Sequence, residues 1–327
     1  MTIETGTNQV DVVIVGGGAA GLSAAVTLGR ARRSTVVVDA GEPRNAPADG
    51  VQGFVTRDGM SPAEFVRTGR AEASAYGVRF VDDSVVGVYG SLEAGFDVET
   101  ATGAVLRARR LIVTSGLVDV LPSIPGLREH WGRGVVHCPY CHGWEIRDRA
   151  VGVVGVDGFA VHQALLFRQW TDRVTLLLHD GPDLSPEDLD KLEARRIEVV
   201  TGPIESVRGA ASRLTGVTMS DGHHVPLEAL AVAPGFRVRA EFLRPVGLLP
   251  TPHPLRPGTR LDADPTGRTA VAGVWAAGNV AEPMQQVVMA AASGVTAAAA
   301  VNADLIDAET AAAVAAGRAA ASVAESR

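Results

Sequence analysis

The stretch "VDVVIVGGGAAGLSAAVTLGRARRSTVVVDAG" (residues 10–41) places two apolar, β-branched runs on either side of a glycine-rich turn and a run of small residues. Apolar β-branched runs of this length predict strands, and the longer segment between them predicts a helix. The second run ends at Asp39. We therefore expect a strand, a tight turn, a helix and a parallel strand, which is the βαβ unit of α/β proteins.

The turn holds Gly16, Gly18 and Gly21 in the pattern G-x-G-x-x-G. The first glycine of this pattern permits the turn, the second lets the backbone approach a pyrophosphate, and the third lets the helix pack on the strand. The helix N-terminus then attracts the anion. A glycine-rich hairpin is the alternative, but it gives no role to Asp39, which is placed to accept a ribose hydroxyl. We interpret the stretch as a dinucleotide site.

Three later segments organise the rest of the chain. Residues 108–126 predict a strand followed by a proline-rich crossover, which marks a domain boundary, and residues 150–180 repeat the strand-turn-helix-strand order of the first unit. Residues 270–301 predict a strand, a glycine turn and a long helix of small residues. The alanine-rich end, residues 307–327, is expected to be a solvated or frayed helix without an assigned function.

The composition favours a globular protein that acts on small molecules. The chain has 327 residues, 46% of them hydrophobic, and a net charge of -7 without a basic block. Two domains are expected from this length, and neither nucleic acid nor an anionic membrane is an expected partner. The N-terminus lacks a signal pattern, and we expect no apolar run of the roughly 18 residues that span a bilayer. The expected location is the cytoplasm.

The only two cysteines, Cys138 and Cys141, lie in "HCPYCHGWE" (residues 137–145), with His137 and His142 beside them. In a reducing compartment such a pair is more often catalytic or metal-bound than structural. A zinc site lacks ligands, because there is no further cysteine and the two histidines are too close in sequence to complete a tetrahedron easily. No metal is therefore expected. A redox pair at a helix start favours thiolate chemistry.

The order of these motifs resembles the low-molecular-weight thioredoxin reductases, which are FAD-dependent pyridine nucleotide-disulfide oxidoreductases. The resemblance spans roughly residues 10 to 305. It implies an α/β fold with two Rossmann-like, three-layer ββα nucleotide-binding domains, the second inserted into the first. The FAD-binding domain would comprise residues 1–118 and 241–327, and the NAD(P)H-binding-like domain with the C-x-x-C pair residues 119–240. It also implies a homodimer.

The resemblance assigns FAD contacts to several separate segments of the chain. The family's G-D and R-Q-A motifs read Gly278-Asn279 and Gln285-Gln286-Val287 here, and an asparagine still offers a hydrogen bond to a ribityl hydroxyl. The predicted cofactor-binding residues are Gly16, Gly18, Ala19, Gly21, Asp39, Arg44, Asn45, Gly116, Gly278, Asn279, Gln286 and Val287.

By the same resemblance, Cys141 faces the flavin and Cys138 exchanges with the substrate sulfur. The family usually carries an aspartate directly after the second cysteine, where this chain has His142. Because imidazole titrates near neutrality, His142 suits a proton relay between thiol and flavin. An ordinary residue at a helix start is the alternative for His142, and His137 is the weaker catalytic candidate.

The second nucleotide unit departs from the family in two places. Asp157 stands where the second glycine should approach a pyrophosphate, and it adds a side chain and a like charge. His179 and Asp180 follow the next strand, where NADPH-using members carry a pair of arginines that bind the 2′-phosphate. NADPH is therefore disfavoured, whereas Asp180 remains compatible with the ribose 2′-hydroxyl of NADH.

Without a hydride donor, the flavin takes its electrons from a substrate dithiol. This arrangement resembles the thioredoxin-reductase-like dithiol oxidases that close disulfides in natural products such as gliotoxin, holomycin and romidepsin, with O2 as electron acceptor. The leading hypothesis is such an oxidase. The alternative is an NAD(P)H-dependent reductase of thioredoxin or a small disulfide, and the alternative of another class is a flavin-dependent redox sensor.

Overall fold

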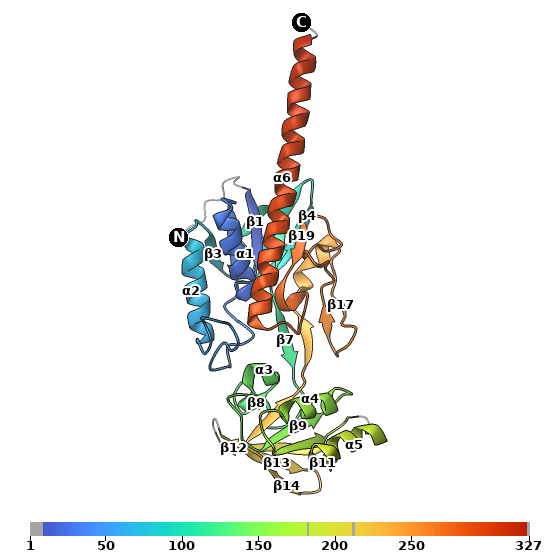
Figure 1. Ribbon diagram of the computed structural model, residues 1–327. Helices are drawn as coiled ribbons and strands as arrows, with labels where there is room; N and C mark the ends of the chain where they lie inside the picture. The colour runs from blue at the N-terminus through green and yellow to red at the C-terminus, as the bar shows by residue number, and fades with distance from the viewer. Residues whose placement is uncertain (1–8, 182, 211–212, 326–327) are drawn as a thin grey trace. The chain divides into compact units, whose positions relative to one another are not determined.

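The computed structural model describes residues 9–181, 183–210 and 213–325, and it shows two compact α/β units (Figure 1). The first unit comprises Met1–Pro43, Val66–Val118 and Val238–Arg327, and the second comprises Arg44–Phe65 and Asp119–Arg237. The chain passes from one unit to the other within the strands β7 (Leu117–Val120) and β16 (Gly235–Val238), and these two strands pair with each other.

The contacts within each unit differ from the predicted domains in two segments. Residues 1–118 were expected in one domain, but residues 44–65 fall in the second unit, and residues 238–240, expected in the second domain, fall in the first unit. Residues 44–61 are a loop whose apolar residues follow no periodic pattern, so the sequence does not assign this segment to either core. Which unit binds which nucleotide stays a prediction.

A parallel sheet forms the centre of the first unit. Its strand order is β3-β2-β1-β6, and β19 pairs in parallel with the second half of β6. The first half of β6 pairs with the antiparallel hairpin β4-β5. The strands are β1 (Val10–Val15), β2 (Thr35–Asp39), β3 (Arg79–Asp82), β4 (Val85–Ser91), β5 (Gly95–Thr100), β6 (Val105–Val113) and β19 (Val274–Ala276).

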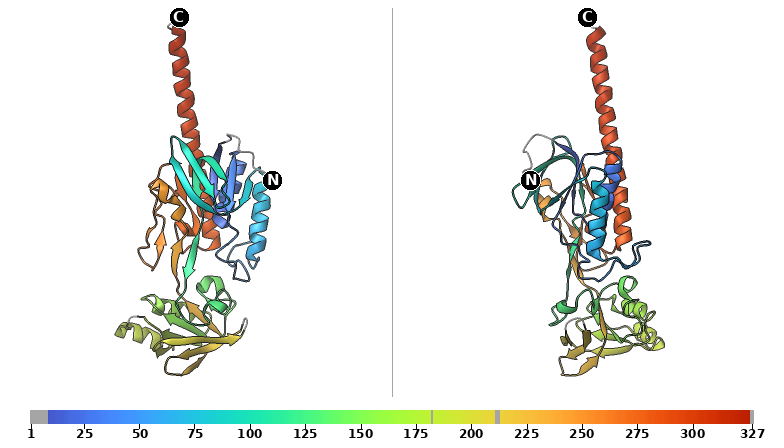
Figure 2. Two further views of the ribbon diagram at one scale, coloured as in Figure 1. Left: turned by 180° about the vertical axis from the view of Figure 1, so that it is seen from behind. Right: turned by 90° about the vertical axis from the view of Figure 1, so that its left-hand side faces the viewer.

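Three helices belong mainly to the first unit, α1 (Ala19–Arg30), α2 (Pro62–Ser74) and α6 (Val287–Glu325). Figure 2 shows them on the same side of the sheet. The helices α1 and α6 pack against each other through small residues, among them Ala20, Ala24, Ala297 and Ala298. Short elements complete the unit, namely η2 (Glu241–Val246), η3 (Gly278–Val280), β17 (Thr251–Pro252) and β18 (Thr259–Arg260).

The second unit has three layers around a parallel sheet of order β11-β10-β9-β15-β8. Its strands are β8 (Val135–Val136), β9 (Val151–Gly155), β10 (Val174–Leu178), β11 (Glu198–Thr201) and β15 (Ala229–Val232). The other elements are η1 (Arg128–His130), α3 (Pro139–His142), α4 (Ala160–Phe167), α5 (Pro186–Ala194) and the antiparallel strands β12 (Ile204–Ala210), β13 (Arg213–Met219) and β14 (His224–Pro226).

Alternate residues of β9 and β10 enter two different cores of the second unit. Val153 and Leu176 pack with residues of α4 and α5, whereas Val154 and Leu177 pack with residues of β12, β13 and β14. Successive side chains of a strand point to opposite faces, so a sheet covered on both faces has continuous apolar strands. This explains why the sequence of these strands is uninterruptedly hydrophobic.

The helix α6 is longer and more apolar than the sequence led us to expect. Residues 287–323 have a mean hydropathy of 1.3 in their most apolar window, which makes this the one helix of the described residues long and apolar enough to cross a membrane. The expectation that no such run exists is therefore wrong on length and composition, because alanine counts as apolar. The N-terminal half of α6 contributes Ala290, Ala297, Val301 and Leu305 to the core of the first unit, as core helices do.

The alanine-rich C-terminal segment is helical as far as Glu325 and exposed over residues 306–323. Figures 1 and 2 show it continuing beyond the sheet of the first unit. A salt-bridge cluster holds the helix where it leaves the sheet. Glu309 accepts hydrogen bonds from Arg33 and Arg109, each at 2.6 Å, and these guanidinium groups lower the pKa of Glu309 to about 2.

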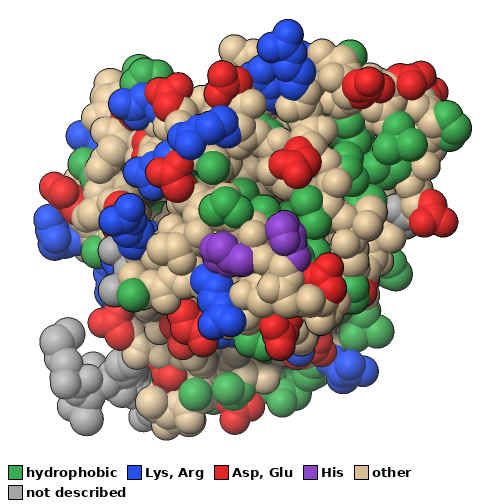
Figure 3. All heavy atoms as spheres, turned by 90° about the horizontal axis from the view of Figure 1, so that it is seen from below, with side chains coloured by type: hydrophobic (Ala, Val, Ile, Leu, Met, Phe, Trp, Pro, Cys, Tyr) green, Lys and Arg blue, Asp and Glu red, His purple; other side chains and the backbone are tan. Residues whose placement is uncertain are grey.

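The surface mixes both signs of charge. On the face drawn in Figure 3, acidic and basic side chains are interspersed with hydrophobic ones. Mixed charge of this kind gives no single-sign field on that face to attract a polyanion.

The packing of α6 on α1 depends on a glycine. A Cβ atom on Gly294 would overlap the backbone carbonyl of Ala20, whereas one on Gly317, in the exposed part of the same helix, would meet no atom within 4 Å. We predict that Gly294→Ala lowers the free energy of unfolding by about 1–3 kcal/mol through overpacking. The matched control Gly317→Ala should leave it unchanged or raise it, because alanine favours helix. Thermal or urea unfolding checks this, and equal midpoints for the two variants would contradict it.

Candidate functional site

The turn between β1 and α1 requires glycine at two of the three predicted positions for reasons of packing. Gly16 has a left-handed φ of 108°, and a Cβ there would meet the carbonyl of Thr114. A Cβ on Gly21 would overlap the carbonyl oxygen of Gly16. The hydroxyl of Thr114 donates to the Gly16 carbonyl at 2.8 Å, which fastens the turn to the end of β6. These contacts fix the loop that precedes α1.

Gly18 differs from its neighbours because the space around it is open. A Cβ there would meet no atom within 4 Å. Gly18 is the N-cap of α1, and no side chain caps this end of the helix. The first turn of α1 contains no acidic residue. An uncapped N-terminus of a helix of 12 residues, beside open space, suits a phosphate group. The residues present therefore fit the pyrophosphate of a dinucleotide, and Ala19 opens the helix there.

Asp39 lies at the end of β2 and is fixed against the same turn. One carboxylate oxygen, Oδ1, accepts a hydrogen bond from the Gly17 backbone N–H at 2.9 Å. A carboxylate has a second oxygen that can accept hydrogen bonds. The predicted contact with a ribose hydroxyl would therefore be made by Oδ2.

The remaining predicted contacts of the first unit follow the same edge of its sheet. Gly116, with a φ of 68°, comes after β6, and Gly278, with a φ of 72°, comes after β19. Because β1, β6 and β19 are parallel, their carboxyl ends lie at one edge, where open α/β sheets bind ligands. A Cβ on Gly278 would contact the side chain of Ala20, so this segment is directly beside α1.

The loop before α6 is braced by its own hydrogen bonds. The Nδ2 of Asn279 donates to the carbonyl oxygens of Glu282, Pro283 and Gln285 at 3.0–3.2 Å. A ribityl contact by Asn279 would therefore fall to its Oδ1. Sequence reasoning missed Ser293, which accepts from the Gly278 N–H at 2.9 Å, because a serine within a helix of small residues carries no signal of this role. Gln286 precedes α6, and Val287 is its first residue.

Arg44 and Asn45 fall in the segment that makes its contacts within the second unit. Both belong to the second unit, and the Arg44 guanidinium makes two hydrogen bonds, at 2.6 and 2.9 Å, to the carboxylate of Asp119. Arg44 is thus engaged in a bidentate ion pair of its own unit. Its role toward a flavin remains a prediction from the resemblance.

The cysteine pair lies at the start of a single helical turn. Cys138 is the N-cap of α3, Pro139 is its first residue, and the backbone N–H groups of Cys141 and His142 donate to the carbonyl of Cys138 at 3.2 and 3.1 Å. Both cysteines are half-buried. Proline is favoured as the first residue of a helix because its φ is preset and the missing N–H is not needed there. The sequence C-P-Y-C therefore forms the turn that keeps both thiols at one end.

Gln163 supports the residue that precedes the pair. It lies on α4 with 7% of its surface exposed, and its Nε2 donates to the carbonyl of His137 at 2.9 Å. Sequence reasoning did not find Gln163, since it is 26 residues away along the chain and belongs to no motif.

His142 is mostly enclosed, and burial lowers its pKa below the usual value of 6.5, against the opposing effect of Glu145. Among the described residues, neither ring nitrogen has a hydrogen-bond partner. A neutral imidazole has one nitrogen that can accept a proton. The surroundings thus suit the predicted relay, and His142 would be in its base form at neutral pH.

The turn after β9 differs physically from the turn after β1. The Asp157 carboxylate accepts a hydrogen bond from the backbone N–H of Phe159, the N-cap of α4, at 3.0 Å. This contact places a negative charge at a helix start that would otherwise attract phosphate. A second charge lies after β10, where Nε2 of His179 is 3.2 Å from the carboxylate of Asp180, and His179 Nδ1 accepts from the Ile204 N–H.

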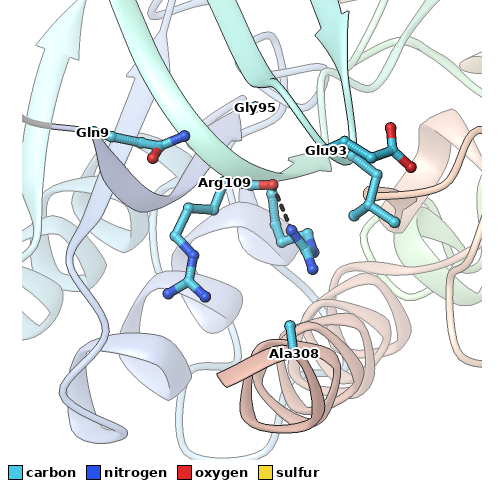
Figure 4. A pocket seen from close by; sticks show the side chains of 7 residues that line it. Gln9, Glu93, Gly95, Arg109 and Ala308 are labelled. Atoms are coloured by element: carbon cyan, nitrogen blue, oxygen red, sulfur yellow. Dashed lines mark hydrogen bonds between the residues drawn. The ribbon is translucent and has the colours of Figure 1, made fainter. Parts of the chain in front are cut away.

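A cavity of about 350 Å³ in the first unit lies outside these turns. Figure 4 shows it between the β4–β5 region and α6, with Arg109 among its lining residues. The Arg109 guanidinium already pairs with Asp11 and Glu309, and the Arg110 guanidinium pairs with Asp304. These ion pairs make the cavity a poor anion site. Among the described residues, no group of three or more His, Cys, Asp or Glu is gathered as metal ligands.

Comparisons with known proteins agree with this architecture. The family model of the pyridine nucleotide-disulphide oxidoreductases matches residues 10–294. The thioredoxin reductase sirT of Leptosphaeria maculans is 32% identical over 92% of this chain and 96% of its own length. The thioredoxin reductase tcpT of Claviceps purpurea is 31% identical over 88% of this chain and 91% of its own.

A solved structure shares the fold over nearly the whole chain. The crystal structure of HlmI is similar with a TM-score of 0.88 and 42% identity, covering 95% of this chain and 97% of that one. The predicted α/β class with two Rossmann-like units and the resemblance to thioredoxin reductases are thereby confirmed, and the family implies a flavoprotein. The chain belongs to the pyridine nucleotide-disulphide oxidoreductase family and is an oxidoreductase that acts on sulfur groups.

Proposed function

We propose that the protein is an FAD-dependent dithiol oxidase that forms a disulfide in a small molecule through Cys138 and Cys141, with O2 as the final acceptor. The FAD would lie on the β1–α1 turn, with its pyrophosphate at Gly18 and the start of α1 and a ribose hydroxyl at Asp39. The oxidase direction is carried by one observation, the carboxylate of Asp157 bonded to the N-cap of α4.

The reason is electrostatic. A nicotinamide dinucleotide would bring its pyrophosphate to the N-terminus of α4, where the Asp157 carboxylate takes a backbone donor and repels a second anion. The residues after β10 supply no arginine for a 2′-phosphate. Asp180 is acidic, and His179 already contacts the Asp180 carboxylate. NADPH is thus disfavoured twice. The side chain of Asp180 is 74% exposed, which leaves NADH as the nucleotide of the alternative reductase.

The cysteine chemistry balances for a dithiol substrate. One substrate thiolate attacks Sγ of Cys138 in the oxidised pair, and Cys141 leaves as a thiolate. The second substrate thiolate then attacks the substrate sulfur of the mixed disulfide, which releases the closed disulfide and the Cys138 thiolate. Two electrons and two protons leave the substrate. FAD, when bound, supplies the two-electron acceptor that restores the cysteine disulfide and is reoxidised by O2 with release of hydrogen peroxide.

His142 would handle one of the two protons. Its neutral ring, directly after Cys141, accepts a proton from a thiol that must ionise before it reacts. Because the pKa of His142 is lowered, this base is available through the neutral range and is lost only as the pH falls below about 6.5.

A homodimer is part of the proposal. The exposed side of α6 carries an uncharged strip of small and apolar residues at helical spacing, here called the α6 strip, which consists of Met289, Ala292, Val295, Thr296, Ala299, Ala303 and Ile306. Meanwhile Asp304 and Glu309 of the same helix are paired with arginines of their own unit. A second copy of this chain fits the α6 strip, since small residues let two helices approach closely and none of the residues of the strip is charged.

Anaerobic reduction tests the direction of electron flow. We predict that a small dithiol such as dithiothreitol bleaches the flavin absorbance, that NADPH and NADH do so at least about a hundredfold more slowly, and that air restores the colour with release of peroxide. Stopped-flow absorbance measures the rates. Cys138→Ser and Cys141→Ser should abolish bleaching by the dithiol. Rapid bleaching by NADH coupled to disulfide reduction would instead establish a reductase.

The second prediction concerns His142. His142→Asn should slow flavin reduction by the dithiol about 10²–10⁴-fold, which is the usual contribution of a positioned base. The rate of the unmodified protein should fall as the pH drops through the lowered pKa of His142, below about 6.5, and this limb should be missing in the variant. His137→Asn is the matched control and should change the rate little. Equal effects of the two variants would argue against the relay.

The third prediction concerns assembly. Ala299→Glu should turn the dimer into a monomer, because it places a charge in the middle of the α6 strip. Ala315→Glu, an exposed alanine on about the opposite side of the same helix, should leave the dimer intact. Analytical ultracentrifugation distinguishes the two states. A dimer that survives Ala299→Glu would place the interface elsewhere.

A further inference from the structure

Two exposed aromatic side chains share the helical turn of the redox pair. The side chains of Tyr140 and Trp144 are each 65% exposed, and they are the most exposed of the large aromatic residues among those described. Backbone N–H groups of Gly143 and Ile146 donate to the carbonyls of Pro139 and His142, so the chain continues in turns beyond α3. Tyr140 lies on α3, and Trp144 lies two residues after the end of α3. The two exposed rings of this segment are here called the aromatic surface.

Both rings are held in place. The Tyr140 ring packs edge-on against Trp170, with ring centroids 5.7 Å apart and planes at 86°. The Arg147 guanidinium lies 4.1 Å from the centre of the Trp144 ring, and its NH1 donates to the Trp144 carbonyl at 2.7 Å. Fixed rings lose little conformational entropy when a ligand stacks on them. The surface is thus organised before anything binds.

Trp170 can reach this turn because Gly143 has no side chain. A Cβ on Gly143 would come within 2.8 Å of two atoms of the Trp170 ring. Trp170 is itself supported by Phe167 of α4, with ring centroids 6.5 Å apart. The packing core of the second unit therefore fixes the direction of the Tyr140 ring.

The surface is close enough to the cysteines to touch whatever they react with. Seven consecutive residues, 138 to 144, contain both sulfurs and both rings, and the four residues of α3 within them rise only about 6 Å. A molecule with a thiol at Cys138 and a carbon skeleton of ordinary ring size would extend over this distance. Exposed aromatic side chains next to a reactive site can bind the apolar part of a ligand.

The size of the surface favours a small molecule over a protein. Aromatic side chains have about 150–250 Å² of surface each, so two rings that are partly exposed offer a few hundred square ångströms at most. A specific protein partner covers about 800 Å² on each side. Two rings cover one face of a drug-sized, ring-bearing ligand.

We propose that Tyr140 and Trp144 bind the carbon skeleton of the dithiol substrate and select a planar, apolar, ring-bearing dithiol over a small hydrophilic one. This inference rests on the proposed function and specifies its substrate class. The rings act in binding, whereas the sulfur exchange at Cys138 needs neither of them.

The test compares two dithiols that differ in their carbon skeletons, benzene-1,2-dimethanethiol and dithiothreitol. Anaerobic stopped-flow reduction of the flavin in the full-length holoenzyme gives the rate at saturation and the half-saturating concentration for each. For the unmodified protein, the rate at saturation divided by the half-saturating concentration should be higher for the aromatic dithiol than for dithiothreitol. Tyr140→Ala and Trp144→Ala should each lower that preference about tenfold. The half-saturating concentration of the aromatic dithiol should rise, and the rate at saturation should stay the same.

Three controls separate binding from other effects. Trp144→Phe should keep most of the preference, because an aromatic face remains. Tyr89→Ala removes another exposed tyrosine, on β4 of the first unit, and should change nothing. Dithiothreitol should reduce the flavin of every variant at the unmodified rate, which shows that each variant is folded and retains a working cysteine pair.

The outcomes distinguish this inference from the proposed function. Equal rate loss for both dithiols, or an unchanged preference in both alanine variants, overturns the aromatic surface and leaves the oxidase standing. If neither dithiol reduces the flavin but NADH does, the oxidase fails. The same variants are then assayed with the cyclic disulfide of the aromatic dithiol as electron acceptor. A tenfold rise in its half-saturating concentration supports the aromatic surface, and an unchanged concentration overturns it.

Discussion

The architecture of the first unit depends on backbone segments that approach each other where side chains are missing. Gly16 and Gly21 let the β1–α1 turn fit against Thr114, and Gly294 lets α6 lie on the backbone of Ala20. Any Cβ at these places would overlap a carbonyl group or come too close to one, so a single methyl group would separate the elements that form the candidate FAD site. Because α1 starts at this turn, its uncapped N-terminus lies at the candidate FAD site. Cofactor binding and packing therefore rely on the same contacts.

The two nucleotide turns illustrate how one side chain changes the chemistry of a repeated fold. Both follow a buried parallel strand and precede a helix, but Gly18 leaves open space where Asp157 brings a carboxylate to a backbone N–H. The first turn uses the Gly17 N–H for Asp39 and leaves the N-terminus of α1 without a side-chain cap, whereas in the second turn the carboxylate bonds to the N–H of the N-cap residue itself. The second unit nevertheless retains two complete cores, so it can hold α3 and the cysteine pair in a fixed position whether or not it binds a nucleotide.

The redox pair takes its properties from neighbours of different kinds. Burial lowers the pKa of His142, Gln163 donates to the carbonyl of His137 before Cys138, and Trp170 packs against the ring of Tyr140. Two of these neighbours, Gln163 and Trp170, lie on or just after α4, the helix that follows the altered nucleotide turn. The proposed oxidase thus uses that helix as a support for α3 and its substrate surface.

The sequence by itself determined the βαβ units, the positions of the glycine turns and the presence of a lone C-x-x-C pair, because local periodicity and short motifs depend on neighbours along the chain. It also located Asp157 and Asp180 as departures. Only the tertiary structure decided that Arg44 pairs with Asp119, that residues 44–65 join the second unit, and that the Asp157 carboxylate accepts from the N–H of Phe159. The roles of Ser293 and Gln163 likewise emerged there. Hydrogen bonds between residues far apart in sequence leave no local pattern, so their partners are fixed only when the chain is folded.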